Sequence, residues 1–192
     1  DYKRVPEQVI HRMYKMIKTS TLPKFCKKIN SIDEINNYFT VNLTNRYDRV
    51  RVIGDIHGCY TALQQAITPW DEKTLYIFCG DYLERGIENK EMMYEMMRLS
   101  TFPNTIMLEG NHERHIANFA FHTNLNRSKR FMKDVVAPIV KDMTKKEVES
   151  LQRELRLFYK SLRQCYPFSF HGKKYLVSHG GLSYVPNMTF IA

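Results

Sequence analysis

From Val50 onward, short runs of apolar residues alternate with longer stretches in which apolar residues recur every three or four positions. The short runs have the length of buried strands, and the longer stretches have the period of helices that bury one face. An alternation of strand and helix is typical of βαβ units with a parallel sheet. The pattern predicts strands at Val50–Ile53, Leu75–Cys79, Thr105–Leu108 and Tyr175–Val177, and crossover helices at Ala62–Ile67 and Glu88–Leu99.

Residues 115–165 are predicted to be a long, basic helical insertion. Its clearest helix begins after Thr144, because Glu147 three residues later completes a capping box. Beyond the insertion, Tyr166–Phe170 and Lys174–Val177 are predicted to pair as a hairpin. The main helix of the insertion carries a seam, facing the core or another helix, in which apolar residues repeat at spacings of three and four: Val148, Leu151, Leu155, Phe158 and Leu162.

The N-terminal part of the chain has a different pattern. Residues 5–18 are predicted to be helical, and the break from Thr19 to Pro23 indicates a boundary. We therefore expect two parts. Residues 1–22 form a linker or the end of a preceding domain, and residues 23–192 form one domain that carries the basic insertion.

The composition is that of a globular protein. Apolar residues make up 43% of the chain and charged residues 26%, and no apolar run reaches the length of a membrane span. The four cysteines are scattered without close pairing, which favours reduced thiols in the cytoplasm. The net charge of +9 is uneven, since residues 50–115 carry −4 and residues 116–165 carry +6. Such basic flanks favour a polyanionic or phosphorylated substrate, although solvated helical faces account equally well for the charges.

Four polar motifs follow the predicted strands: Gly54–Gly58, Gly80–Gly86, Gly110–Glu113 and Ser178–Gly181. The carboxyl ends of strands are where α/β sheets build their active sites. The carboxylate, imidazole and amide groups of these motifs suit Mn²⁺, iron or Zn²⁺ in a two-metal hydrolytic site.

The spacing of the motifs divides the candidate ligands between two ions. Asp55 and His57 lie two positions apart and can reach one ion from the same strand end. Asp81 ends the next strand and can bridge two ions through its carboxylate, while Asn111 and His179 supply neutral donors to the second ion. Two such ions lower the pKa of a shared water and hold the phosphoryl oxygens of an in-line displacement.

Three further residues are candidates for the catalytic machinery. Arg85 is placed to bind a phosphate through two donors. His112 is the predicted general acid for the leaving oxygen, and Glu84 is the predicted carboxylate that keeps this imidazole oriented and protonated.

In their order and spacing over residues 50–182, these motifs resemble those of the binuclear metallophosphoesterases, in the branch that includes the phosphoprotein phosphatases. The resemblance implies an α/β (α+β) fold in which two mixed β-sheets flanked by helices form a four-layer sandwich. It implies His112 as the acid and Arg85 as the phosphate-binding residue. It also implies two divalent ions, with Mn²⁺ expected and Fe, Zn²⁺, Ni²⁺ or Co²⁺ as alternatives. The implied ligands are Asp55, His57 and Asp81 on one ion and Asp81, Asn111 and His179 on the other.

Two features depart from the family pattern. Glu84 stands where the family usually has Asp, so its carboxylate is carried on a longer side chain. The family also has another metal-binding His in a later segment, and no His follows His179. We expect that the chain is a longer protein truncated at its C-terminus. A catalytically inactive relative is the alternative.

The substrate prediction depends on a second resemblance. The segment Tyr2–Tyr14 resembles the closing helix of P-loop polynucleotide kinase domains, and Cys59 follows the first motif as in bacterial RNA-repair polynucleotide kinase-phosphatases. This implies a fused kinase domain upstream and a phosphatase that removes 3′-phosphates or opens 2′,3′-cyclic phosphates at RNA ends. Alternatives on the same scaffold are a Ser/Thr or Tyr phosphoprotein phosphatase and a dinucleoside tetraphosphate hydrolase. A non-catalytic binding module is the alternative from another class.

Overall fold

The computed structural model describes His11 and residues 41–180. The domain boundary predicted at residue 22 and, apart from His11, the helix predicted at residues 5–18 lie outside the described residues. The described elements follow the order β1 (Arg49–Ile53), α3 (Tyr60–Ile67), β2 (Thr74–Phe78), α4 (Asn89–Leu99), β3 (Thr105–Met107), α5 (Glu113–Ala120), η1 (Leu125–Ser128), α6 (Lys129–Phe131), η2 (Met132–Val136), α7 (Ala137–Val140), α8 (Lys145–Ser161), β4 (Cys165–Phe170) and β5 (Lys173–Ser178).

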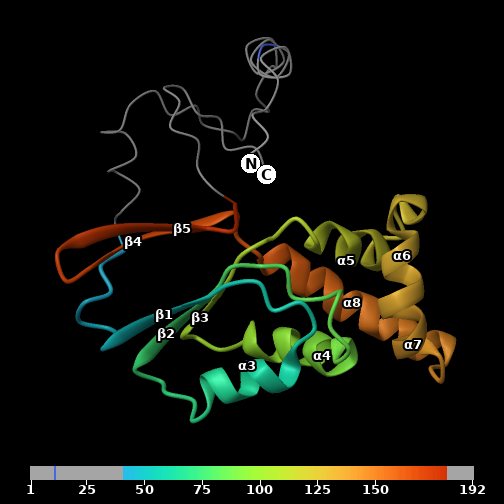
Figure 1. Ribbon diagram of the computed structural model, residues 1–192, viewed down its shortest axis with the longest axis horizontal. Helices are drawn as coiled ribbons and strands as arrows, with labels where there is room; N and C mark the ends of the chain where they lie inside the picture. Colours follow the sequence, from blue (N-terminus) through green and yellow to red (C-terminus); the bar gives the residue numbers. More distant parts are fainter. Residues whose placement is uncertain (1–10, 12–40, 181–192) are drawn as a thin grey trace, which may run out of the picture. The chain divides into compact units, whose positions relative to one another are not determined.

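The central sheet has the strand order β1-β2-β3, and all of its strands are parallel, as the alternation of strand and helix predicts. Every residue of β2 is buried, because both faces of this strand are covered. Tyr76 and Phe78 pack in the core formed with α3 and α4, while Leu75 and Ile77 pack toward β4. Figure 1 shows the two helices below the sheet and the β4–β5 hairpin above it.

The predicted hairpin is confirmed. Strands β4 and β5 pair antiparallel, from Cys165 opposite Ser178 to Phe170 opposite Lys173. The turn between them consists of His171 and Gly172, whose φ angles are 47° and 73°. Two consecutive left-handed residues are the mark of the two-residue turns that match the twist of a hairpin. The described part of the fold thus contains one parallel and one antiparallel sheet, flanked by helices.

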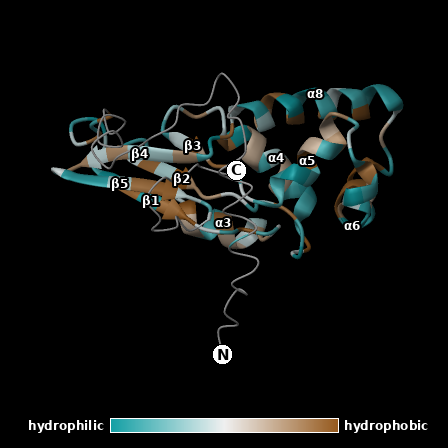
Figure 2. Ribbon diagram, turned by 90° about the horizontal axis from the view of Figure 1, so that it is seen from above, coloured by the Kyte–Doolittle hydropathy of each residue, from teal (hydrophilic) through white to brown (hydrophobic). Residues whose placement is uncertain are grey.

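The insertion is helical, as predicted, and gathers at one end of the sheet (Figure 1). Helix α8 starts at the predicted capping box, in which Thr144 and Glu147 satisfy each other's main-chain N–H groups. Leu151, Leu155 and Phe158 of the predicted seam are buried, which explains the alternating hydropathy along α8 in Figure 2. In residues 41–180 no helix is long and apolar enough to cross a membrane.

Candidate two-metal centre

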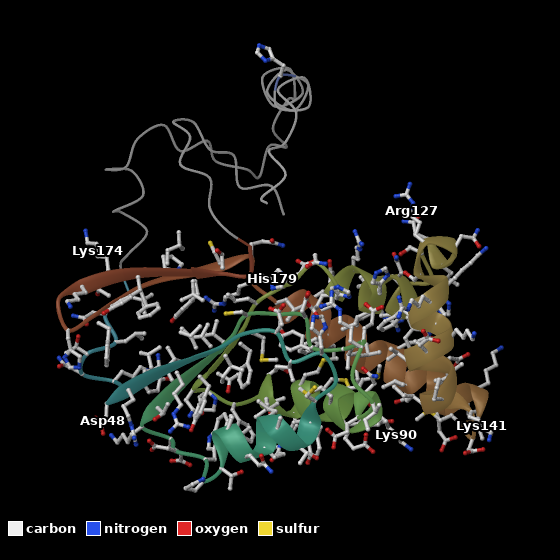
Figure 3. The ribbon with its side chains drawn as sticks, viewed as in Figure 1. Asp48, Lys90, Arg127, Lys141, Lys174 and His179 are labelled. Atoms are coloured by element: carbon white, nitrogen blue, oxygen red, sulfur yellow. The ribbon has the colours of Figure 1, made fainter. Side chains whose placement is uncertain are left out.

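The polar motifs lie at strand ends. Asp55 and His57 follow β1, Asp81 follows β2 and Asn111 follows β3. Because these strands are parallel, their carboxyl ends share one edge of the sheet. His179 comes from the other sheet, directly after β5, and is labelled in Figure 3. The structure therefore brings together residues that are up to 124 positions apart, from Asp55 to His179.

Main-chain hydrogen bonds join the loop after β1 to the loop after β2. The N–H groups of Ile56 and His57 donate to the carbonyl oxygen of Asp81 at 3.2 and 2.9 Å, and the N–H of Gly86 donates to the carbonyl oxygen of His57 at 2.8 Å. His57 and Asp81 have left-handed backbones, with φ of 47° and 54°. This conformation costs a non-glycine residue about 1–2 kcal/mol. The hydrogen bonds offset the strain and hold both side chains at the same edge.

Two glycines allow the loops after β2 and β3 to touch. A Cβ atom on Gly80 would lie 2.4 Å from the main-chain nitrogen of Gly110, and a Cβ atom on Gly110 would lie 2.3 Å from Oδ1 of Asp81. Both distances are far shorter than a van der Waals contact. A side chain at either position would therefore push Asp81 away from the residues after β3.

Asp81 is the buried centre of the site, with 3% of its surface exposed. Its Oδ2 atom lies 3.6 Å from Nε2 of His57, and its Oδ1 atom lies 3.5 Å from Nε2 of His179. The main-chain N–H of His112 donates to Oδ1 at 3.0 Å. The two carboxylate oxygens thus face two different imidazoles, an arrangement that allows the carboxylate to bridge two ions.

The imidazoles of His57 and His179 turn lone pairs toward these carboxylate oxygens. Nδ1 of His57 lies 3.1 Å from the carbonyl oxygen of Leu83, and Nδ1 of His179 lies 2.9 Å from that of Cys79. A carbonyl oxygen only accepts, so in each neutral ring Nδ1 carries the proton and Nε2 is bare. Nε2 of His57 is buried and has no hydrogen-bond partner within the described residues. Metal-binding histidines have this arrangement, with one nitrogen donating to the protein and the other free for the ion.

The distances from Asp81 and Asn111 to the two imidazoles also fit divalent cations. The carboxylate of Asp55 lies farther away, at 3.8 Å from Nε2 of His57 and 3.8 Å from Nδ1 of His179. An ion that holds nitrogen and oxygen ligands at about 2.1 Å separates neighbouring ligand atoms by roughly 3.0–3.6 Å. Oδ1 of Asn111 lies 3.0 Å from the bare Nε2 of His179. These lone pairs face one another, and cations between them would turn repulsion into attraction.

Candidate metal ligands gather in more than one group around Asp81, and their predicted division between two ions stays a prediction. Asp81 belongs to two groups of side chains whose ligand atoms lie within 4.8 Å of one another, one with Asp55 and His179 and the other with His57 and His112. This double membership agrees with a bridging Asp81. Asp55 lies equally near His57 and His179, so its assignment to one ion stays a prediction.

The three predicted catalytic residues are neighbours beside this centre. Nδ1 of His112 is hydrogen-bonded to the carboxylate of Glu84, and Nε2 of His112 lies 3.3 Å from Nη2 of Arg85. Glu84 and Arg85 are consecutive left-handed residues, with φ of 75° and 66°. Strained backbone of this kind concentrates at functional sites. The structure places Glu84 against His112 as expected, and the catalytic roles of all three residues stay predictions.

A pocket of about 470 Å³ lies next to His112 and Arg85. One wall comes from the loop after β2 and the start of α4. The other wall comes from the basic insertion, through Arg130, Asp134 and Val135. A substrate whose phosphoryl group lies between Arg85 and His112 would extend into this pocket.

A family model described as calcineurin-like phosphoesterase matches residues 48–191, which include every residue of the centre. The chain belongs to this family. Members of the calcineurin-like phosphoesterase family use divalent metals, and the His and Asp groups described above could hold them.

Individual relatives of this phosphoesterase chain carry several activities. Serine/threonine-protein phosphatase 2 of Salmonella typhimurium is 37% identical over 93 residues, which cover 47% of this chain and 40% of that protein. The symmetrical bis(5′-nucleosyl)-tetraphosphatase of Baumannia cicadellinicola is 32% identical over 136 residues, which cover 68% of this chain and 41% of that protein. The chain therefore spans less than half the length of either relative.

The fold of the phosphoesterase chain is also found among solved structures. A protein serine/threonine phosphatase from Saccharomyces cerevisiae superposes with a TM-score of 0.50 at 20% identity, covering 96% of this chain and 57% of that one. This likeness confirms the predicted fold class of two sheets flanked by helices.

Glu113 stabilises the site, although the sequence motifs alone did not indicate a role for it. It is fully buried, and its carboxylate accepts hydrogen bonds from the main-chain N–H groups of Asp81 at 2.8 Å, Tyr82 at 3.1 Å and Gly110 at 2.6 Å. Burial raises the pKa of this carboxyl group, and the three hydrogen bonds oppose that shift. Glu113 thus ties together the loops after β2 and β3. An acidic residue at the first position of a helix was the available signal.

Asn89 is a second residue that sequence reasoning missed. Its Oδ1 atom accepts from the main-chain N–H of Glu84 at 2.8 Å, and its Nδ2 donates to the carbonyl oxygen of Gly86 at 2.6 Å. Asn89 therefore holds the left-handed pair Glu84 and Arg85 from both sides. Asn beside a glycine-containing loop often caps main-chain groups in this way, which is the signal that could have found it.

Proposed function

We propose that the protein hydrolyses phosphoesters with two divalent ions held by Asp55, His57, Asp81, Asn111 and His179. One observation carries the proposal. The bare Nε2 atoms of His57 and His179 face opposite oxygens of the buried Asp81 carboxylate, at 3.6 and 3.5 Å. Buried lone pairs facing one another are unfavourable unless cations bind between them.

When bound, two such ions would supply an activated water and neutralise charge on the phosphoryl group. The guanidinium of Arg85 donates to phosphoryl oxygens and fixes their orientation. In the structure Nε2 of His112 accepts from Nη2 of Arg85 at 3.3 Å, and Nδ1–H donates to Glu84. With Arg85 on the phosphoryl group, Nε2 would be free to carry the proton for the leaving oxygen. The carboxylate of Glu84 stabilises the protonated ring and keeps it turned toward the phosphoryl group. Arg85 and His112 lie 3.3 Å apart, so both reach the same substrate group.

Mn²⁺ is the ion that we expect, with Fe, Zn²⁺, Ni²⁺ and Co²⁺ as alternatives. The five proposed ligands offer oxygen and imidazole nitrogen but no thiolate, a set that suits harder divalent ions. The test is to restore p-nitrophenyl phosphate hydrolysis in metal-free protein with each ion separately. Highest activity with Zn²⁺ would contradict the choice of Mn²⁺ and leave the two-metal proposal standing.

For the substrate we propose RNA ends that carry a 3′-phosphate or a 2′,3′-cyclic phosphate. The basic insertion supports this, because it carries +6 over residues 116–165 and contributes Arg130 to the pocket beside His112. Basic side chains bind backbone phosphates independently of base sequence. The resemblance of Tyr2–Tyr14 to a kinase terminus also supports a cytoplasmic RNA-repair enzyme with a kinase domain upstream. That segment lies outside the described residues.

Two other substrates are favoured by specific relatives. A phosphoserine or phosphothreonine protein is favoured by the 37% identity to the Salmonella typhimurium phosphatase. A dinucleoside tetraphosphate is favoured by the 32% identity to the Baumannia cicadellinicola tetraphosphatase.

The deciding experiment compares kcat/KM in Mn²⁺ for a 3′-phosphorylated RNA oligonucleotide, a phosphoserine peptide and diadenosine tetraphosphate. Asp81→Asn protein, prepared in the same way, controls for contaminating phosphatases. Preference for the RNA end supports RNA repair, and preference for either other substrate overturns it. No metal-dependent hydrolysis of any phosphoester would overturn the enzymatic proposal and favour a non-catalytic binding module.

A further inference from the structure

His115 has no part in the mechanism above, yet it lies against the residues proposed to protonate the leaving group. A ring nitrogen of His115 and the ligand atoms of Glu84 and His112 all lie within 4.8 Å of one another. The rings of His112 and His115 meet edge to face, with their centroids 6.1 Å apart. His115, the first residue of the basic insertion, therefore lies against the Glu84–His112 pair.

The position of His115 is fixed by residues of that insertion. Its Nδ1 atom lies 2.8 Å from Oγ of Ser128, which is 1% exposed. Nδ2 of Asn118 donates to the same Oγ at 2.8 Å, which leaves the hydroxyl proton of Ser128 free to donate to His115. The ring of Phe131, also 1% exposed, stacks on His115 with centroids 5.8 Å apart. Two buried side chains thus hold the imidazole by one edge and one face.

The electrostatics suit a neutral imidazole at this position. Burial lowers the pKa of His115, and the nearby Arg114 and His112 lower it further, while Glu84 acts in the opposite direction. Because a neutral His115 carries no charge, the carboxylate of Glu84 has His112 as its charged partner. His115 can therefore support the Glu84–His112 pair by contact alone.

We propose that His115, held by Ser128 and Phe131, is a positioning residue that keeps Glu84 and His112 in the geometry for protonating the leaving oxygen. The insertion then contributes to the chemical step as well as to the pocket. This inference rests on the proposed phosphoester hydrolysis. A third cation held by Glu84, His112 and His115 is the competing explanation of the cluster, and metal content distinguishes the two.

The test compares substrates that differ in their need for an acid. An alkyl phosphate has a strongly basic leaving group that must be protonated, whereas p-nitrophenyl phosphate has a leaving group that departs without a proton. His115→Phe keeps an aromatic ring against Phe131 and removes both nitrogens. We expect kcat for the alkyl phosphate to fall about tenfold and kcat for p-nitrophenyl phosphate to change less than about twofold. KM and bound metal should be unchanged.

Ser128→Ala provides a second variant that leaves His115 in place and removes its hydrogen bond. It should show the same selective loss, and the double variant should be no slower than His115→Phe, because both substitutions act through one contact. His122→Asn is the matched control. His122 also lies in the insertion, and its Nε2 atom lies 3.1 Å from Oε1 of Gln152, while no hydrogen bond within the described residues joins it to Glu84, His112 or His115. It should leave both substrates unaffected.

An equal fall for both substrates, or no fall for either, would overturn the positioning role. Loss of a third bound ion in His115→Phe would overturn it in favour of a metal site. If the wild-type protein hydrolyses neither substrate with Mn²⁺ or with any of the alternative ions, the proposed function itself fails, and this inference fails with it.

Discussion

The strand-end loops and helix α8 differ in what stabilises their backbone. Helix α8 satisfies its first turn through the local pair Thr144 and Glu147 and buries an apolar face. The loops after β1 and β2 contain four non-glycine residues with left-handed backbones, and each of these is a site residue: His57, Asp81, Glu84 and Arg85. Left-handed backbone also occurs at His122, Asn124 and His171, but in these two loops it falls only on residues that carry the proposed chemistry.

The loops depend on partners distant in sequence. Glu113 holds the main chain of Asp81 from 32 positions away, and Gly80 must touch Gly110 across 30 positions. The start of helix α8 depends on a pair three positions apart, Thr144 and Glu147, although Gln152 and Tyr159 farther along the helix also hydrogen-bond to distant residues. The comparison therefore predicts that substitutions in the loops remove activity with little effect on the helix, and that substitutions in the helix cap lower stability with little effect on activity.

Asp81→Asn should have the largest effect. Asn tolerates left-handed backbone and can still accept from the N–H of His112, but it loses the charge that lies between His57 and His179. We expect loss of measurable phosphatase activity and loss of both tightly bound ions, the latter measured by metal analysis after gel filtration. Asp142→Asn, at an exposed position of the insertion, is the control and should retain the activity and the two ions. One tight ion remaining in Asp81→Asn would contradict the bridging role.

His112→Ala should follow. Removing a general acid lowers turnover by about 10²-fold or more, while the ligands of the ions remain. The measurement pairs kcat for an alkyl phosphate with the metal content of the same sample. A variant that loses metal along with activity would show that His112 has been misassigned, since it also lies 3.8 Å from Oδ2 of Asp81.

Arg130→Gln addresses the contribution of the insertion to substrate binding. Arg130 lines the pocket, whereas the exposed Arg127 does not. One lost phosphate contact should raise KM for the 3′-phosphorylated oligonucleotide about fivefold at low salt. KM for p-nitrophenyl phosphate should not change. Equal effects of Arg130→Gln and Arg127→Gln would mean that only the overall charge of the insertion matters.

Thr144→Ala should have the smallest effect on activity. Loss of the helix cap should lower the free energy of unfolding by about 1 kcal/mol, measured by urea titration, with kcat unchanged. Hydrogen bonds from Thr144 also lower the pKa of Glu147. A lowered carboxyl pKa stabilises the fold above the ordinary glutamate pKa of about 4.3 and loses that effect as the pH falls below it. The difference between wild type and variant should therefore shrink in acid, and a constant difference would contradict the capping box.

The parts predicted from sequence are those that depend on local pattern. The strands, the crossover helices and the Thr144 cap follow from hydrophobic period and capping chemistry, and the structure confirms them within one or two residues at each end. The strand-end positions of Asp55 and Asp81 follow from the same pattern.

The parts that sequence did not predict depend on packing between distant segments. The three hydrogen bonds to Glu113 arise only when the loops after β2 and β3 meet. The hydrogen bonds of Asn89 to the main chain of Glu84 and Gly86 form only because the loop before α4 folds back onto this residue. The contact of His115 with Ser128 needs the chain to turn through η1 and return to α5. Neither hydrophobic periodicity nor motif spacing predicts these long-range contacts of Glu113, Asn89 and His115.

The central claim is that one strand-end centre binds two ions. The most direct measurement is the number of Mn²⁺ ions bound per chain in wild-type protein, by elemental analysis after removal of loosely bound metal. We expect two ions per wild-type chain and none in Asp81→Asn. One ion or none in the wild type would show that the strand-end residues do not form a two-metal centre.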